Sequence, residues 1–255
     1  MSDAQGAFTR ATGRGLGDRD AEGAGPDKPR YRRYQFDLIA PHCGASVLEV
    51  GGGLGEFSAQ FGGLRRLVVT DVDPDAVAVM DERFAGDARV ADEIEARRFD
   101  LDAHDRLDRP VESVVAINVL EHFEDDAAVL ASLARSVVPG GTIVLWVPGY
   151  QSLFSEFDRK VGHFRRYTPA TLRDAIQRAG LRCERVRPVN LLGGLAWWTA
   201  MRLGRAQTPN SGAVGVYDRF IVPATRVLDR VLPVPFGQSV LAVVRVPEAG
   251  TSRDR

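Results

Sequence analysis

The stretch VLEVGGGLG, residues 47–55, decides the fold class of this chain. Its apolar first half is typical of a buried strand. The glycine-dense second half predicts a tight turn, because glycine adopts backbone angles closed to other residues and lets a ligand approach the main chain. The next residues, EFSAQF at 56–61, predict the start of a helix. A strand, a glycine turn and a helix in this order form the nucleotide-binding corner of a doubly wound α/β domain.

The spacing of the glycines narrows the choice of ligand. A dinucleotide fingerprint, G-x-G-x-x-G, would need a glycine where this chain has Glu56. The glycines alternate instead, at Gly51, Gly53 and Gly55, and Glu49 precedes them. A carboxylate beside the turn disfavours a phosphate, which a helix N-terminus binds as an anion, and favours a cationic ligand. A dehydrogenase is therefore disfavoured, although a turn that only packs strand against helix stays open.

A second acidic position follows a second strand. Residues 67–70 predict a short buried strand that ends at Asp71. A carboxylate at this strand end, roughly 20 residues beyond a glycine turn, is placed to accept both hydroxyls of a ribose. Pro74 then predicts the first turn of a helix, because its missing N–H would have no partner there.

The same acidic run offers a rival interpretation as a calcium loop. Asp71, Asp73, Asp75 and Glu82 follow the register of such a loop. The loop needs a glycine for its sharp turn, and this chain has Ala76 there. A calcium site is therefore disfavoured, and the sequence predicts no metal site.

The segment from 111 to 148 carries two further motifs. Residues 111–119 are an apolar run suited to a central parallel strand, and they end in the motif NVLEH at 118–122. A helix is predicted over 123–137, where PGG at 139–141 stops it before a strand at 142–147. Together with the glycine turn and the acidic loop, these motifs resemble the class I S-adenosylmethionine (SAM)-dependent methyltransferases. The resemblance covers roughly residues 28–190.

The remaining pattern agrees with that resemblance. Further helices are predicted at 28–40, from Pro74 to about 84, and at 168–179. Of the further strands, one ends near 101 and the other two cover 181–190 and 238–246. Alternating strands and helices predict a largely parallel sheet with helices on both faces. The family implies a doubly wound, mostly parallel seven-stranded sheet of the Rossmann-like methyltransferase fold.

The resemblance also implies a cofactor, S-adenosyl-L-methionine, and residues that hold it. The glycine turn surrounds the methionine end, the second strand end holds the ribose, the third holds the adenine edge, and the fourth lies near the methionine. Asp102 competes with Asp100 for the adenine edge. Capping and packing are preferred over catalysis for Glu121 and His122. The implied cofactor-binding residues are Glu49, Gly51, Gly53, Gly55, Asp71, Val72, Asp100, Leu101, Asn118 and Leu120.

The motif GHFRRYT, residues 162–168, resembles the G-H-x-R-R-Y-T element of a bacterial subgroup of these enzymes. It follows the fifth strand, so it is expected over the carboxyl edge of the sheet, where ligands bind. His163 is the candidate general base, because imidazole titrates near neutral pH. The alternative is a structural loop, and this alternative is favoured for Arg166, which could pair with Asp158.

The acceptor is less defined. Residues 191–198 are strongly apolar, and 217–232 predict an amphipathic helix. These segments are interpreted as a lid, a dimer face, a monotopic membrane contact or, preferably, a cover for the far end of the sheet. The substrate-binding candidates are Tyr31, Tyr150, Arg165, Tyr167 and Trp197.

Composition supports one soluble domain with a sizeable core. The chain has 255 residues, 44% of them hydrophobic, and a net charge of −1, so no nucleic-acid partner is expected. Cys43 and Cys183 form no metal or redox motif. No signal peptide and no segment long enough for stable membrane insertion is recognised. We expect a cytoplasmic monomer or homodimer, with a flexible segment at 1–27, one domain at 28–247, lid and acceptor-site insertions at 149–235, and a tail at 248–255.

The predicted function is methyl transfer from SAM to an oxygen or nitrogen nucleophile of a small molecule, hydrophobic secondary metabolites included. Two alternatives stay open: a non-catalytic SAM-binding scaffold of the same fold, and a methyltransferase that acts on a lipid-linked acceptor.

Overall fold

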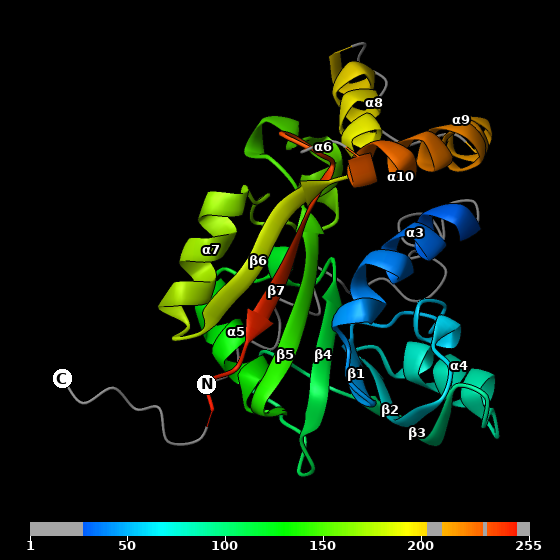
Figure 1. Ribbon diagram of the computed structural model, residues 1–255, viewed down its shortest axis with the longest axis vertical. Coiled ribbons are helices and arrows are strands. Elements are labelled where there is room, and N and C mark those ends of the chain that lie inside the picture. Colours follow the sequence, from blue (N-terminus) through cyan, green and yellow to red (C-terminus); the bar gives the residue numbers. More distant parts are fainter. Residues whose placement is uncertain (1–27, 203–210, 232–233, 249–255) are drawn as a thin grey trace.

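The computed structural model describes residues 28–202, 211–231 and 234–248 (Figure 1). The predicted flexible segment at 1–27 and most of the predicted tail lie outside these residues. A seven-stranded sheet forms the centre, in the order β3-β2-β1-β4-β5-β7-β6. The strands are β1 (Ser46–Val50), β2 (Leu64–Asp71), β3 (Ala91–Arg98), β4 (Val111–Ile117), β5 (Val137–Pro148), β6 (Arg182–Val189) and β7 (Ser239–Arg245).

Neighbouring strands from β3 to β5 pair in parallel, and β7 pairs antiparallel with both β5 and β6. The prediction of a mostly parallel seven-stranded sheet is confirmed. The strand order reverses between β1 and β4, which is the point where open α/β sheets bind their ligands.

Helices lie on both faces of the sheet, as predicted (Figure 1). One face carries α3 (Pro29–Ile39) and α4 (Pro74–Phe84), and the other carries α5 (Asp126–Ala134) and α7 (Pro169–Arg178). Four helices lie at the carboxyl edge of the parallel strands. They are α6 (Glu156–Lys160), α8 (Leu191–Arg202), α9 (Ser211–Val216) and α10 (Val222–Val231), with a π-helical turn, Tyr217–Ile221, before α10.

The core explains the apolar runs of the strands. Along β5, Ile143 and Leu145 pack towards α5 and α7, while Val144 and Trp146 pack towards α3 and α4, and all four are fully buried. A strand buried on both faces has no polar side to alternate with. Burial of each such side chain contributes roughly 1.5–3 kcal/mol, so these strands stabilise the sheet that carries the site.

The helix predicted at 56–61 is wrong. Only a 3-10 turn forms, at Ser58–Gln60. Phe57 and Phe61 both pack on Phe36 of α3, with ring centroids 5.6 and 5.0 Å away. Two glycines at 62–63 follow at once, and Gly63 adopts a positive φ of 69°, which leaves no length for a helix.

Three element boundaries also differ from the prediction. The helix expected at 123–137 starts at Asp126, because the Asp125 side chain caps it by accepting the Ala128 N–H at 2.9 Å. The PGG at 139–141 belongs to β5, which already begins at Val137. The third strand ends at Arg98 rather than near 101.

The amphipathic segment predicted at 217–232 is helical where the structure describes it, through the π-helical turn and α10. In the described residues, every helix is too short or too polar to cross a membrane.

Candidate cofactor and acceptor site

The glycine turn after β1 needs its glycines for conformation. Gly51, Gly53 and Gly55 all adopt positive φ angles, 69°, 56° and 72°. An added Cβ at Gly51 would lie 2.8 Å from Val119, so this glycine also permits contact with the turn after β4. An added Cβ at Gly53 would meet no atom within 4 Å. The turn is therefore bare backbone that is open at Gly53, as a close-binding ligand requires.

Asp71 lies against this turn, at the end of β2. Its Oδ2 accepts the Gly53 N–H at 3.0 Å, and its Oδ1 accepts the Asp73 N–H at 3.0 Å. An ionised carboxylate offers about four acceptor positions. The two backbone bonds thus orient Asp71 towards the glycine turn.

Glu49 is buried beside the turn, with 3% of its surface exposed. It accepts a hydrogen bond from the Ser58 hydroxyl. Burial raises the pKa of Glu49 to about 7, with a smaller contribution from the charge of Asp71, while the Ser58 bonds act in the opposite direction. A cation bound at the turn would favour the ionised form.

The loop after β3 carries the residues that the sequence predicts at the adenine edge. The Asp100 carboxylate accepts the Asp102 N–H at 3.0 Å and pairs with Arg98 at 2.9 Å. Asp102 is exposed, and the Leu101 side chain is buried in the core. Val72, half-buried, follows β2 at the same sheet edge. Asp100 therefore organises the loop, while the Asp102 side chain is the more accessible of the two acids.

Strained backbone marks the carboxyl edge. Asn118, Tyr150 and Asn190 have positive φ angles of 52°, 61° and 63°, and they follow β4, β5 and β6. Non-glycine residues held in this region are concentrated at functional sites. Asn118 is exposed there, whereas Leu120 in the next turn is buried.

His163 lies in the loop after α6 and is held by Asp158. The Nδ1 of His163 lies 2.9 Å from Asp158 Oδ1, and Arg166 binds both oxygens of the same carboxylate at 2.8 and 3.0 Å. Burial acts to raise the pKa of Asp158, but the bonds from His163 and Arg166 lower it to about 2. An ionised carboxylate only accepts, so Nδ1 of His163 is the donor, and in the neutral imidazole Nε2 then carries the lone pair. Arg166 therefore has the structural role that the sequence favours.

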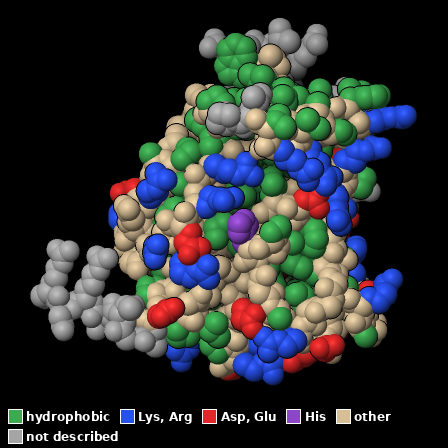
Figure 2. Space-filling view, in the orientation of Figure 1, with side chains coloured by type: hydrophobic (Ala, Val, Ile, Leu, Met, Phe, Trp, Pro, Cys, Tyr) green, Lys and Arg blue, Asp and Glu red, His purple; other side chains and the backbone are tan. Residues whose placement is uncertain are grey.

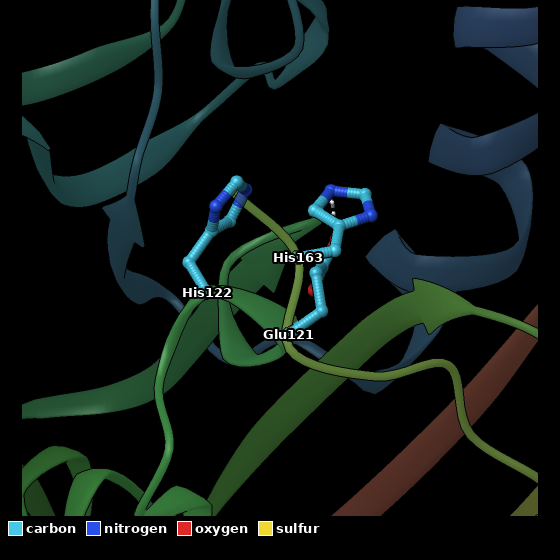
Figure 3. A group of neighbouring side chains, drawn as sticks. All are labelled: Glu121, His122 and His163. Atoms are coloured by element: carbon cyan, nitrogen blue, oxygen red, sulfur yellow. Dashed lines mark ion pairs between the residues drawn. The ribbon is translucent and has the colours of Figure 1, made fainter. Parts of the chain in front are cut away.

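Glu121 faces that lone pair. Its side chain is fully buried, and Glu121 Oε1 lies 3.7 Å from His163 Nε2 (Figure 3). Neither carboxylate oxygen has a hydrogen-bond partner among the described residues. Burial raises the pKa of Glu121 to about 8. The His122 ring meets the His163 ring edge to face, with centroids 4.7 Å apart.

The sequence did not predict that these three side chains meet. Capping and packing were preferred for Glu121 and His122, which give no local sign of a partner. The sequence feature that could have indicated this cluster is an acid–histidine pair after one strand, together with a second histidine in the loop after the next strand. The two segments touch through the Phe164 N–H, which donates to the Glu121 carbonyl at 2.8 Å.

Two acceptor candidates have internal partners. Arg165 Nη1 and the Tyr167 hydroxyl both bind Asp126 Oδ2, each at 3.1 Å. Tyr167 is almost fully buried, and the pKa of its hydroxyl is raised by burial and by Asp126. These contacts attach the loop to the start of α5, so we leave both residues out of the proposed acceptor site.

The other three candidates lie among the edge helices. Trp197 of α8 donates from its indole N–H to the Leu153 carbonyl at 3.1 Å. The Tyr150 hydroxyl donates to the Pro235 carbonyl at 2.8 Å. The Tyr31 ring packs edge-on against Trp146 with centroids 6.2 Å apart.

Comparison with known proteins identifies the family. A family model described as a methyltransferase domain matches residues 24–186, more than half of the chain. The chain belongs to this family of SAM-dependent methyltransferases. The enzyme class and the cofactor predicted from the sequence are confirmed.

The relatives agree in fold. A protein of Mycolicibacterium smegmatis named "Probable S-adenosylmethionine-dependent methyltransferase" is 26% identical over 186 residues, 71% of this chain and 70% of its own. The N-methyltransferase NodS of Bradyrhizobium japonicum, solved with S-adenosyl-L-homocysteine, has a TM-score of 0.57 at 17% identity and covers 94% of this chain and 99% of its own. A chain from the complex that contains the Haloferax volcanii Trm112 methyltransferase activator has a TM-score of 0.61 at 16% identity. The match covers 95% of this chain and 98% of that chain.

Proposed function

We propose that this methyltransferase acts on an oxygen or nitrogen nucleophile of a small molecule, and that the acceptor is bound between the glycine turn and the loop that carries His163. The observation that supports this most is a continuous set of contacts. Gly51 approaches Val119, the Glu121 carbonyl accepts the Phe164 N–H, and Glu121 faces His163. The donor and acceptor sides of the site thus share one sheet edge.

The residues of the donor side fit SAM. The turn at 51–55 is open at Gly53, Asp71 is oriented towards it, and Glu49 offers a carboxylate next to the cationic end. When bound, SAM supplies an electrophilic methyl group on a sulfonium. Asp102, exposed in the loop after β3, is the proposed partner of the adenine edge, with Val72 against the base. These residues fix the direction of the methyl group, and alignment of reacting groups contributes roughly 7–11 kcal/mol in favourable cases.

On the acceptor side, His163 receives the proton of the nucleophile. Asp158 fixes the tautomer that leaves Nε2 unprotonated, and the His163 side chain is only 10% exposed, so water competes little for this lone pair. Tyr31, Tyr150 and Trp197 offer aromatic surface for the acceptor. We propose that residues 28–247 form one domain and that 149–235 supplies the acceptor-side elements.

The acceptor is sought by incubating the enzyme with methyl-labelled SAM and fractionated small-molecule extracts. The non-catalytic alternative predicts SAM binding without labelled product from any fraction. A lipid-linked acceptor predicts label only on a compound that carries a covalently attached lipid, whereas our proposal places the label on a small molecule without one, whether polar or hydrophobic.

With the acceptor known, His163→Gln tests the proton acceptor. We expect turnover to fall by roughly 10²–10⁴-fold, the usual contribution of general base catalysis, with unchanged SAM affinity by calorimetry. His42→Gln is the matched control, because His42 lies in the 3-10 turn Ala40–His42 that precedes β1, at the opposite edge of the sheet. Full activity of His163→Gln would make His163 structural.

A further inference from the structure

We propose that Glu121, His122 and His163 form a binding site for a divalent transition-metal cation at the carboxyl edge of the sheet. One side-chain ligand atom from each residue lies within 4.8 Å of the others. Figure 3 shows the three side chains rising together from two segments, the turn after β4 and the loop after α6. Metal–ligand bonds of roughly 2.0–2.2 Å hold ligand atoms within about 4.4 Å of one another, so a small closure completes the site.

The buried carboxylate points to a cation. Glu121 is fully buried, and neither of its oxygens has a hydrogen-bond partner among the described residues. A buried polar group without a partner is rare in folded proteins and calls for an explanation such as an ion. Arg166 acts on Glu121 through its charge but gives it no hydrogen bond, because the hydrogen bonds of its guanidinium go to Asp158. A cation between Glu121 and the two imidazoles would satisfy both the carboxylate and the lone pair of His163.

The surroundings of His163 match those of a metal ligand. Metal-binding histidines usually donate their other ring N–H to a carboxylate, which fixes the ring and raises its basicity. Asp158 does this for Nδ1 of His163 at 2.9 Å, and Ser155 and Arg166 hold Asp158 in turn. Nε2 is thereby directed at Glu121.

The ligand set indicates the class of metal. Two imidazoles and one carboxylate suit zinc, iron, nickel or cobalt better than magnesium or calcium, which prefer oxygen ligands. Three protein ligands leave coordination positions open, and an acceptor oxygen can occupy one of them. This step rests on the proposed function, because it places the acceptor beside His163. A metal on Nε2 would replace the role of His163 as proton acceptor. In the metal-loaded enzyme the metal would lower the pKa of a bound acceptor hydroxyl, and its proton would pass to solvent.

The test measures metal binding without SAM or acceptor. Tag-free protein is stripped with a chelator and titrated with Co²⁺, followed by visible absorption and by calorimetry. We expect one Co²⁺ per chain and d–d bands of an imidazole–carboxylate site. Glu121→Gln and His122→Ala should weaken binding by at least about 100-fold, because each removes a ligand, and Asp158→Asn by roughly 10–100-fold, because it removes the partner that orients one.

Two controls keep the outcome unambiguous. His42→Gln removes an imidazole elsewhere in the chain and should bind Co²⁺ like the wild type. Circular dichroism of Glu121→Gln, an isosteric change, checks that the fold is kept. Wild-type binding that is absent, or that Glu121→Gln does not weaken, would overturn the metal site and leave methyl transfer untouched. Tight Co²⁺ binding without any labelled product would instead count against the proposed function alone.

Discussion

Glu49 is an acid that lies buried beside the glycine turn. Burial raises its pKa from 4.5 to about 7. Between these values the unfolded chain loses a proton that the folded protein keeps, so the free energy of unfolding falls as pH rises through this window. The loss amounts to about 3 kcal/mol at most.

Glu49→Gln therefore should flatten the pH dependence of stability. We expect the difference in unfolding free energy between pH 5 and pH 7.5, measured with urea, to shrink relative to the wild type, because the amide does not ionise. The comparison of the two proteins cancels the other titrating groups. Equal pH dependence in both would show that Glu49 is ionised in the folded protein.

At the scale of elements, α3 depends on a distant segment for its start. Lys28 provides no side-chain cap. Instead Asp218, in the π-helical turn, accepts the N–H groups of Tyr31 and Arg30 at 2.8 and 3.3 Å. Arg226 of α10 also forms an ion pair with Asp37 of α3. The helices at the sheet edge thus hold α3, and with it Tyr31, in place.

Asp218→Ala should destabilise the protein by roughly 0.5–2 kcal/mol, the usual cost of losing an N-cap. Hydrogen exchange at the first turn of α3 should accelerate, while α4, which Asp73 caps locally, should not change. Asp218→Asn keeps an acceptor oxygen and should cost less. Unchanged exchange in α3 after Asp218→Ala would contradict the cap.

Local signals predicted the elements that depend on neighbours in sequence. Pro74 predicted the start of α4, because a proline is tolerated in the first turn of a helix, and the structure adds a cap from the Asp73 side chain. The turn at 56–61 was missed because aromatic contacts with α3 outweigh helix propensity there. Asp218 could not be foreseen as a cap, because it lies 187 residues from Tyr31 in the sequence.

At the scale of the whole molecule, hydrophobic side chains gather at the end formed by α8–α10 (Figure 2). The large exposed ones on these elements are Leu195, Trp198, Val216, Phe220, Val227 and Val231. The same helices bury Val214 and Val222, so they do cover the sheet edge. The dimer-face and membrane-contact interpretations of this segment stay predictions.

The sequence predicted the strand ends that form the site but not the side-chain contacts between its loops. Motif spacing placed the glycine turn and Asp71 on adjacent strand ends, because parallel strands end at one edge. The spacing carried no information on which side chains meet across loops. Tyr167 therefore turned out to be buried against Asp126, and Glu121 to face His163.

The most direct test compares SAM affinity in Gly53→Ala and Gly63→Ala. Both glycines have positive φ angles, 56° and 69°, and an added Cβ meets no atom within 4 Å at either. Both variants should lose stability alike, roughly 1–2 kcal/mol for an L-residue in this conformation. Gly63, however, lies at the amino end of β2, away from the turn. By calorimetry we expect Gly53→Ala to lose SAM affinity and Gly63→Ala to retain it; equal affinities in the two variants would contradict the site.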